Sequence, residues 1–173
     1  FSAGPELGAG ELRRGHRATV LDDGRIIFTG GKWRYQDEAT NSINEQIWRP
    51  ALVFDPSLDD GRGDFVTSIV MRDARVYHSA TVLSDGRLLL AGGECDVDAL
   101  PPTRDPDDPC NDTEPEVACV EGFLRTTEIF DPSTGTSTCG PILAEGRSSH
   151  SAVKVGTQSV ALIGGRNASA VSY

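Results

Sequence analysis

Short apolar runs recur along the chain in pairs, and a turn signal separates the two runs of each pair. The clearest pairs flank Asp23-Gly24 and Asp85-Gly86, and a less regular pair flanks Val155-Gly156-Thr157. Asp-Gly favours a two-residue hairpin turn, because both turn positions accept positive φ. The pattern therefore predicts antiparallel hairpins, and their uniformly apolar strands lead us to expect cover on both faces. The best-defined strands are expected at 18–21 and 26–29 and at 80–83 and 88–91.

Each hairpin belongs to a longer repeat. Three segments begin with Arg-x-x-His and end with Gly-Gly, and the three histidines of the protein all occupy this position. The repeated positions are Arg13, His16, Gly30 and Gly31; Arg75, His78, Gly92 and Gly93; and Arg147, His150, Gly164 and Gly165. The segments start 62 and then 72 residues apart, which indicates a repeat architecture with a fixed core and variable inserts.

A second shared element follows the Gly-Gly pairs. Residues 52–57 match residues 128–133, and both end in Phe-Asp-Pro-Ser, which indicates a third strand stopped by a proline turn. Residues 64–67 and 135–138 are the expected starts of a fourth strand. Four antiparallel strands that follow one another in sequence form one blade of a β-propeller.

Together these elements resemble kelch repeats, in the form seen in bacterial kelch proteins and galactose-oxidase-like propellers. The resemblance rests on the Arg-x-x-His starts, the Asp-Gly-Arg hairpins, the Gly-Gly pairs and the Phe-Asp-Pro-Ser strands, and it covers nearly the whole chain. One departure is that the fourth-strand Trp common in kelch blades is missing. Phe65 and Thr138 or Cys139 stand near its place instead. The resemblance implies an all-β fold of kelch-type, four-stranded antiparallel blades, incomplete in this chain, in which the Arg, His and Gly positions are framework.

The repeat also suggests how the chain is divided. Residues 1–5 resemble residues 137–141, so residues 1–11 are expected to be the closing strand of a preceding blade. The remaining parts are a first blade at 12–70, a second blade at 71–142 with an insert at 94–121, and part of a third blade at 143–173. Their expected neighbours are other blades of the same propeller or another copy of the chain, because open strand edges seek partners.

The acidic residues are concentrated in one segment. The formal net charge is −10, and residues 94–121 carry ten Asp or Glu against a single base, Arg104. Phosphate binding needs a basic face, so we expect no nucleic-acid partner. We also expect no membrane insertion, because no stretch reaches the ~20 apolar residues of a membrane-spanning helix.

Two long connections lie between the second and third strands. The first runs from Lys32 to about Gln46 and carries Trp33 and Tyr35, and the second runs from Glu94 to about Thr126. Ordinary connections have about 4–6 residues. Inserts of this kind on repeat proteins often line a binding face, which makes Trp33 and Tyr35 a candidate binding loop, and the alternative is decoration without function.

Four cysteines occur in or near the second insert, and disulfides are favoured over zinc because there is no Cys-x-x-Cys pair and no histidine nearby. The candidates are Cys95, Cys110, Cys119 and Cys139. The preferred pattern pairs Cys95 with Cys110 or Cys119, and Cys139 with one of the remaining sulfurs. Disulfides place the protein outside the cell, in a periplasm or at the cell surface.

The second insert is also dense in hard oxygen ligands, which makes it a calcium candidate. The residues concerned are Asp105, Asp107, Asp108 and Asp112. The competing interpretation is a solvated acidic loop, since no EF-hand spacing is present and prolines restrict the segment. No other cofactor is expected.

No catalytic residue stands out. Three equivalent histidines are what a structural repeat produces, and no G-x-S-x-G, P-loop or H-E-x-x-H motif occurs. The sequence favours a non-catalytic, secreted or cell-surface propeller that binds or scaffolds a protein or glycan. The alternative is a fragment of a galactose-oxidase-like copper oxidase, or of another carbohydrate-active propeller enzyme, with its site in blades outside this chain; whether the protein is an enzyme therefore stays open.

Overall fold

The protein is all-β across the residues that a computed structural model describes, which are 13–96, 119–157 and 159–169. Besides its strands, this part contains one 3₁₀ turn, η1 (Asp59–Gly61). The paired strands are antiparallel, as the sequence predicts. Among the described residues, no helix is long and apolar enough to cross a membrane.

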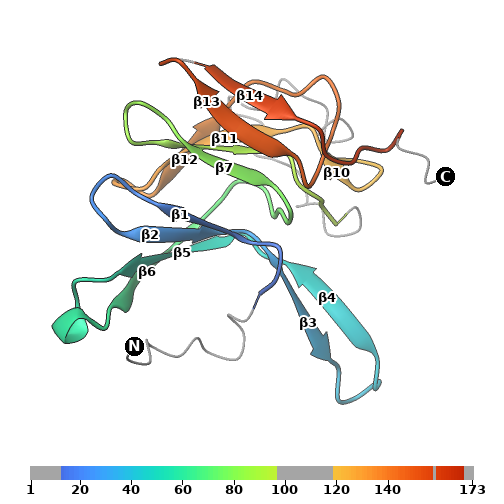
Figure 1. The fold of residues 1–173 in the computed structure, drawn as a ribbon. Helices are drawn as coiled ribbons and strands as arrows, with labels where there is room; N and C mark the ends of the chain where they lie inside the picture. Colours follow the sequence, from blue (N-terminus) through green and yellow to red (C-terminus); the bar gives the residue numbers. More distant parts are fainter. Residues whose placement is uncertain (1–12, 97–118, 158, 170–173) are drawn as a thin grey trace.

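Two four-stranded sheets and a further hairpin make up the body of the fold (Figure 1). Sheet 1 has the order β1 (Arg17–Val20), β2 (Ile26–Thr29), β5 (Pro50–Asp55) and β6 (Asp64–Val70). Sheet 2 has the equivalent order β7 (Ser79–Val82), β8 (Leu88–Ala91), β11 (Thr127–Asp131) and β12 (Thr136–Cys139). The third hairpin pairs β13 (Ser151–Val155) with β14 (Ser159–Ile163). In both sheets the strands therefore lie side by side in the order of the sequence.

The two inserts contain strands of their own, whereas the sequence suggested loops. The first insert is a regular hairpin of β3 (Lys32–Gln36) and β4 (Ile43–Ile47), which projects away from sheet 1 (Figure 1). The second ends in a short ladder of β9 (Cys119–Val120) and β10 (Phe123–Leu124). The signal for β3 was the alternation of aromatic and polar residues in Trp-Arg-Tyr-Gln, which is a strand pattern.

The core lies between sheets 1 and 2. Apolar side chains from the middle strands of both sheets, and from the residues that directly follow β1 and β6, form one buried cluster. Its members are Leu21, Ile27, Ala51, Val53, Met71, Leu88, Leu90 and Phe130. Most of these residues are fully shielded from solvent, so each side chain larger than alanine contributes roughly 1.5–3 kcal/mol of burial free energy and the two sheets are held face to face.

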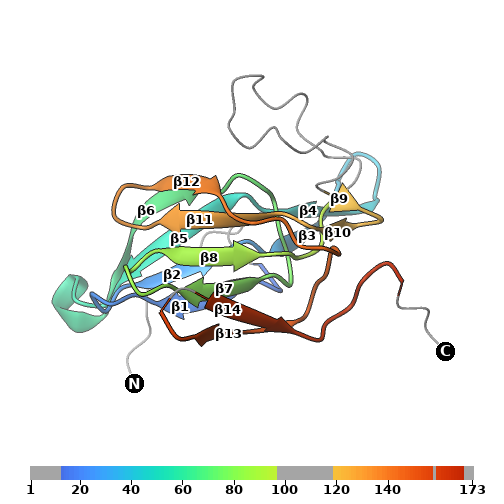
Figure 2. The same cartoon turned by 90° about the horizontal axis from the view of Figure 1, so that it is seen from above.

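The first strands of the successive units lie next to one another. Strand β7 contacts β1 on one side and β13 on the other, so sheet 2 lies between sheet 1 and the third hairpin (Figures 1 and 2). The expected cover on both faces is wrong for β1, where Val20 is 64% exposed, and Val153 and Ile163 of the third hairpin are also exposed. Within the described residues, sheet 1 and the third hairpin each pack against sheet 2 on one face, and their other faces remain open.

The Gly-Gly pairs lie where one unit meets the next. The amide of Gly31 donates to the carbonyl of Arg75 over 2.9 Å, and the amide of Gly93 donates to the carbonyl of Arg147 over 2.8 Å. Gly30 has φ +59°, and a Cβ there would overlap the Arg75 carbonyl oxygen. Glycine is therefore required at this joint for its backbone conformation and for the close approach of two main chains.

A second backbone contact repeats at the third residue of each Arg-x-x-His segment. Gly15, Tyr77 and Ser149 all have positive φ, although two of them carry side chains. The amide of Tyr77 donates to Gly15 over 2.9 Å, and the amide of Ser149 donates to Tyr77 over 2.8 Å. A relay of main-chain hydrogen bonds thus runs from sheet 1 through sheet 2 to the third hairpin.

We expect Gly30→Ala to destabilise the protein much more than Gly24→Ala. Both glycines have positive φ, but a Cβ at Gly24 meets nothing within 4 Å, whereas at Gly30 it meets main chain of the neighbouring sheet. Gly24→Ala should therefore cost only the conformational strain of about 1–2 kcal/mol, and Gly30→Ala should cost at least about 2 kcal/mol more. Urea unfolding measures the free energy of unfolding of both variants. Equal losses of unfolding free energy would contradict the close contact of Gly30 with the neighbouring sheet.

Candidate functional site

The repeated histidines connect one unit to the next. His78 Nε2 shares a hydrogen bond with Thr29 Oγ1 of sheet 1 at 2.8 Å, and His150 Nε2 shares one with Ser79 Oγ of sheet 2 at 2.9 Å. Both rings are buried at the joints between units. His16 instead contacts its own segment, with Nδ1 3.1 Å from the Arg13 carbonyl oxygen.

The hydroxyl that meets the histidine comes from different strands at the two joints. Thr29 is directly paired with Arg17 in sheet 1, and Ser79 is directly paired with Ala91 in sheet 2. Thr29 and Ala91 hold equivalent positions in the repeat, as do Arg17 and Ser79. Either member of this cross-strand pair therefore supplies the hydroxyl.

Burial keeps the two joint histidines neutral. It lowers the pKa of His78 well below its ordinary range, with the charges of Arg75 and Arg17 acting in the same direction. Burial, followed by the charge of Arg147, lowers the pKa of His150 to about 4. The Nδ1 atoms of both rings are buried and have no hydrogen-bond partner among the described residues. Protonation would place an unpaired cation beside arginine at each joint.

The repeated arginines bind the main chain of their own repeat. The Nη1 atoms of Arg13, Arg75 and Arg147 donate to the first glycine of each Gly-Gly pair, over 3.1, 2.7 and 3.1 Å. The glycine carbonyls concerned are those of Gly30, Gly92 and Gly164. Each arginine thereby fixes the end of the second strand against the start of its repeat.

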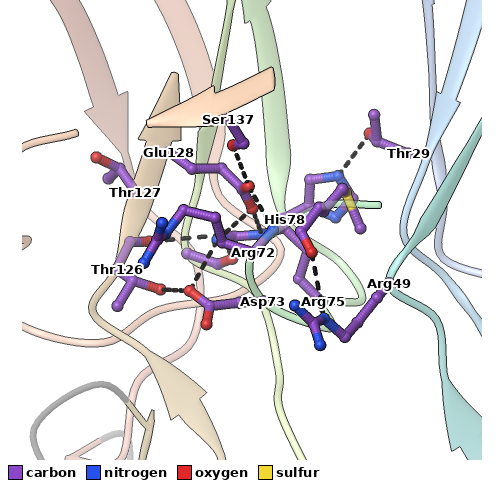
Figure 3. Close-up of polar contacts among 12 residues, drawn as sticks. Thr29, Arg49, Arg72, Asp73, Arg75, His78, Thr126, Thr127, Glu128 and Ser137 are labelled. Carbon is purple, nitrogen blue, oxygen red and sulfur yellow. Dashed lines mark hydrogen bonds and ion pairs between the residues drawn. The ribbon is translucent and has the colours of Figure 1, made fainter. Parts of the chain in front are cut away.

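Sheet 2 adds a buried polar network around Arg75 (Figure 3). The guanidinium pairs with Glu128 at 2.9 Å and with Asp73 at 3.3 Å, and both Arg75 and Glu128 are almost completely buried. The second Glu128 oxygen accepts from the Arg72 amide at 2.8 Å and from Ser137 Oγ at 2.6 Å. Because its charges are paired and hydrogen-bonded, the network tolerates burial, and it joins β11, β12 and the segment that enters sheet 2.

A further arginine is repeated in both sheets but was not among the framework positions predicted from the sequence. Arg49 Nε donates to the Met71 carbonyl over 3.2 Å, and Arg125 Nε donates to the Leu143 carbonyl over 3.0 Å. The amides of Met71 and Leu143 donate back to the carbonyls of the same arginines. The sequence signal is an Arg six residues before the Asp of each Asp-Pro-Ser turn, three residues before the matched segments 52–57 and 128–133.

Three charged residues from successive repeats meet at one cavity. Lys32, Glu94 and Arg166 each follow a Gly-Gly pair directly, and each pairs with the segment between the Arg and the His of its repeat. All three line a cavity of about 570 Å³, which we call the charged cavity. The sequence carries a signal for this cavity. The residue after each Gly-Gly pair is charged and its sign differs between repeats, whereas the residue before each pair is uncharged.

The first insert supplies one wall of the charged cavity and an aromatic pair. Trp33 and Tyr35 stack with ring centroids 4.7 Å apart and planes 18° apart, so the two aromatic residues of the candidate binding loop form one packed pair. Glu45 on the facing strand pairs with Lys32 at 2.9 Å, with Arg34 at 3.1 Å, and with Arg14. The hydrogen bond from Lys32 is the main reason that the pKa of Glu45 is lowered.

A second cavity, of about 710 Å³, lies beside the charged cavity, and we call it the hairpin cavity. Its walls include Tyr35, Trp48, Arg49 and Arg72, whereas Trp33 does not line it. The two cavities share Glu45, Ile47, Cys95 and Asp96. Together they form a continuous recessed surface between the two inserts.

A disulfide fixes the second insert at this surface. Cys95 and Cys119 are bonded, with Cα atoms 6.3 Å apart, which confirms a disulfide and one of the two expected partners of Cys95. Cys139 is disulfide-bonded as well, and Cys110 lies outside the described residues. Because Cys95 lines both cavities, the bond holds their shared wall in place.

The calcium candidates Asp105, Asp107, Asp108 and Asp112 also lie outside the described residues. Within the part that the structure describes, no three His, Cys, Asp or Glu side chains are grouped so that they could hold a metal ion. The joint histidines are not arranged as ligands, since each uses Nε2 for a hydroxyl of the neighbouring unit.

Comparison with known proteins gives a structural likeness only. No family model and no curated protein sequence matches the chain. A solved structure described as a novel fungal alcohol oxidase with catalytic diversity among the AA5 family, in complex with copper, is similar over 84% of this chain, with a TM-score of 0.58 and 17% identity. The chain spans 26% of the length of that protein. At this identity the likeness shows the all-β fold alone.

We expect the stability of the protein to fall between pH 6.5 and pH 4. An unfolded histidine binds a proton near pH 6.5, whereas folded His150 binds one only near pH 4, so in this range the unfolded state holds more protons. The stabilisation is complete above pH 6.5 and is lost as the pH falls. His150 alone accounts for about 3 kcal/mol, and His78 acts in the same direction.

Urea unfolding at pH 7.5, 6, 5 and 4 measures this loss. His150→Gln keeps a side-chain donor that can reach Ser79 but removes the titrating group. The variant should therefore lose less stability than the parent between pH 6 and pH 4. A parallel decline of both proteins would rule out His150 as the source.

Proposed function

We propose that the chain contributes two blades and the inner hairpin of a third to a kelch-type propeller, and that its insert-bearing face binds a protein or glycan without catalysis. The observation that carries the proposal is the recessed surface of two adjoining cavities, whose walls combine residues of both inserts with residues of the repeats. Concave sites of about 300–1,000 Å³ with a few polar groups are the usual form of ligand sites.

The repeated joint supports the propeller. Gly31 binds Arg75 and Gly93 binds Arg147 in the same way, so each unit is placed on the next by the same contact. A fixed step of this kind, continued through further four-stranded sheets, closes a ring of about 4–8 blades. The structural likeness to a quarter of a longer chain agrees with a larger assembly.

The polar groups of the recessed surface support binding rather than chemistry. Glu45 is held by three cations, and Glu94 accepts from Ser148 Oγ at 3.1 Å while Arg166 lies 3.8 Å away. No described residue on this surface forms a nucleophile–base pair of the kind that covalent catalysis uses. Rigid aromatic rings beside satisfied charges are features of recognition surfaces.

The disulfides favour a place outside the cell, in a periplasm or at the cell surface. Disulfides persist in oxidising compartments and are rare in reducing ones. The Cys95–Cys119 bond closes a segment with eight of the acidic residues and little apolar content, which a reducing environment would leave untethered.

A copper oxidase is the second candidate, and the copper complex of the similar fungal alcohol oxidase is the observation that favours it. The described residues of this chain do not fit a copper site, because the buried histidines are engaged at the joints and no ligand group forms around them. We therefore derive no oxidase step from these residues.

We expect Trp33→Ala to weaken ligand binding at least tenfold. The substitution removes the ring that covers Tyr35 and so disrupts the aromatic unit, while leaving the joints between sheets untouched. Binding is measured on an array of immobilised neutral and acidic glycans and of basic and acidic peptides. Val153→Ala, at an exposed site of the third hairpin, is the matched control and should leave binding unchanged.

The absence of binding to every probe would contradict the proposal. Peroxide production from primary alcohols by the copper-loaded full-length protein would support the oxidase instead. Equal loss of binding in the Trp33 and Val153 variants would show that neither substitution reports on the recessed surface.

A further inference from the structure

The two units provide an internal control that separates framework from function. Trp48 and Leu124 hold equivalent positions, since the amide of Trp48 donates to Gly31 and the amide of Leu124 donates to Gly93, both over 2.8 Å. The framework thus requires only the main chain at this position. The side chain at this position is therefore free to serve a role other than holding the framework together.

Trp48 is a costly choice for stability alone. Its Nε1 is buried and has no hydrogen-bond partner among the described residues, whereas a leucine would bury no polar atom. An unsatisfied buried donor costs about 1–3 kcal/mol. Arg13 lies over the indole at 5.3 Å and holds the ring in the wall of the hairpin cavity. The hairpin cavity is lined by both equivalent positions, and the second unit places the apolar Leu124 there. The rule that buried polar atoms are paired is therefore broken only by Trp48 of this pair, and such exceptions are expected at functional sites.

The hairpin cavity presents flat apolar rings together with planar polar groups. Tyr35 and Trp48 supply the rings, and Trp33 covers one face of Tyr35 without lining the cavity, so the uncovered part of Tyr35 is what a ligand meets. Gln46, Arg49 and Asp96 line the same space. Each of these polar side chains offers two or more hydrogen-bonding atoms in one plane, an arrangement that suits adjacent hydroxyl groups.

The charge of the surroundings narrows the choice of ligand. Cations and carboxylates are mixed within the cavity walls, because Arg49 and Arg72 line the same space as Glu45, Asp73 and Asp96. A polyanion would meet the carboxylates of these walls, and a polycation would meet the guanidinium groups. A polyhydroxylated, uncharged ligand uses both donors and acceptors and meets no such repulsion.

We propose that the hairpin cavity beside Trp48 and Tyr35 binds an uncharged pyranose unit of a glycan, with its apolar ring face on the aromatic side chains and its hydroxyls on Arg49 and Gln46. This inference rests on the proposed function and makes it specific, because it selects a glycan over a protein and one cavity over the other. The joint histidines take no part in the site.

Two substitutions test the site without removing the framework. Trp48→Leu introduces the residue that the second unit already uses. Arg49→Met removes the guanidinium at the cavity, and Arg125→Met is its matched control, because both arginines make the same bond to a main-chain carbonyl and only Arg49 lines the hairpin cavity.

Calorimetric titration with neutral, uronate-containing and amino oligosaccharides, and with a lysine-rich peptide, gives the readout. We expect the neutral oligosaccharide to bind, the Kd to rise at least tenfold in the Trp48 and Arg49 variants, and the Kd to stay within twofold in the Arg125 variant. Thermal unfolding should show similar loss of stability in the two arginine variants.

The outcomes separate the inference from the proposed function. A neutral glycan whose Kd is unchanged by Trp48→Leu and Arg49→Met overturns this placement but leaves a binding module. Preference for the uronate, the amino sugar or the peptide overturns the ligand class. Failure of every probe to bind the parent protein overturns both the inference and the function on which it rests.

Discussion

The carbonyl oxygen of Arg75 is the point on which the relation between the two sheets depends. It accepts the Gly31 amide, and the space that it occupies excludes any side chain at Gly30. The Arg147 carbonyl plays the same part toward Gly93 and Gly92. Because this contact joins main chain to main chain, it fixes the distance and direction of each unit relative to the next independently of which side chains fill the core.

The side chains of the same short segment then secure that contact from both directions. Each arginine binds the carbonyl of the first glycine, at the end of the second strand of its own unit. Each joint histidine instead bonds a hydroxyl of the preceding unit. The Arg-x-x-His spacing thus places two hydrogen-bonding side chains on opposite sides of one turn. In sheet 2, Glu128 and Asp73 neutralise the buried guanidinium of Arg75, which lets the arginine lie at 0% exposure.

The strands and hairpins could be predicted because local signals agree with the repeat. Asp23-Gly24 and Asp85-Gly86 mark turns, and the Gly-Gly pairs mark strand ends. The β3–β4 hairpin was missed because its length suggested a loop, although Trp33 and Tyr35 alternate with polar residues. The cavities were beyond prediction, since Tyr35, Trp48 and Cys95 are brought together by the packing of sheet 1 against sheet 2 and not by spacing along the chain. The disulfide was predicted, but its partner was narrowed only to Cys110 or Cys119.

The alternation of Thr29 and Ser79 at the histidine joints has a consequence for how such repeats diverge. The two hydroxyls come from opposite members of equivalent cross-strand pairs in the two sheets, so either strand can provide the partner of the ring nitrogen. A unit that loses its hydroxyl on one strand can regain the joint by acquiring one on the other. The two positions of such a pair are therefore expected to change together during evolution. An alignment that scores each position separately would underestimate how well the histidine–hydroxyl hydrogen bond is conserved.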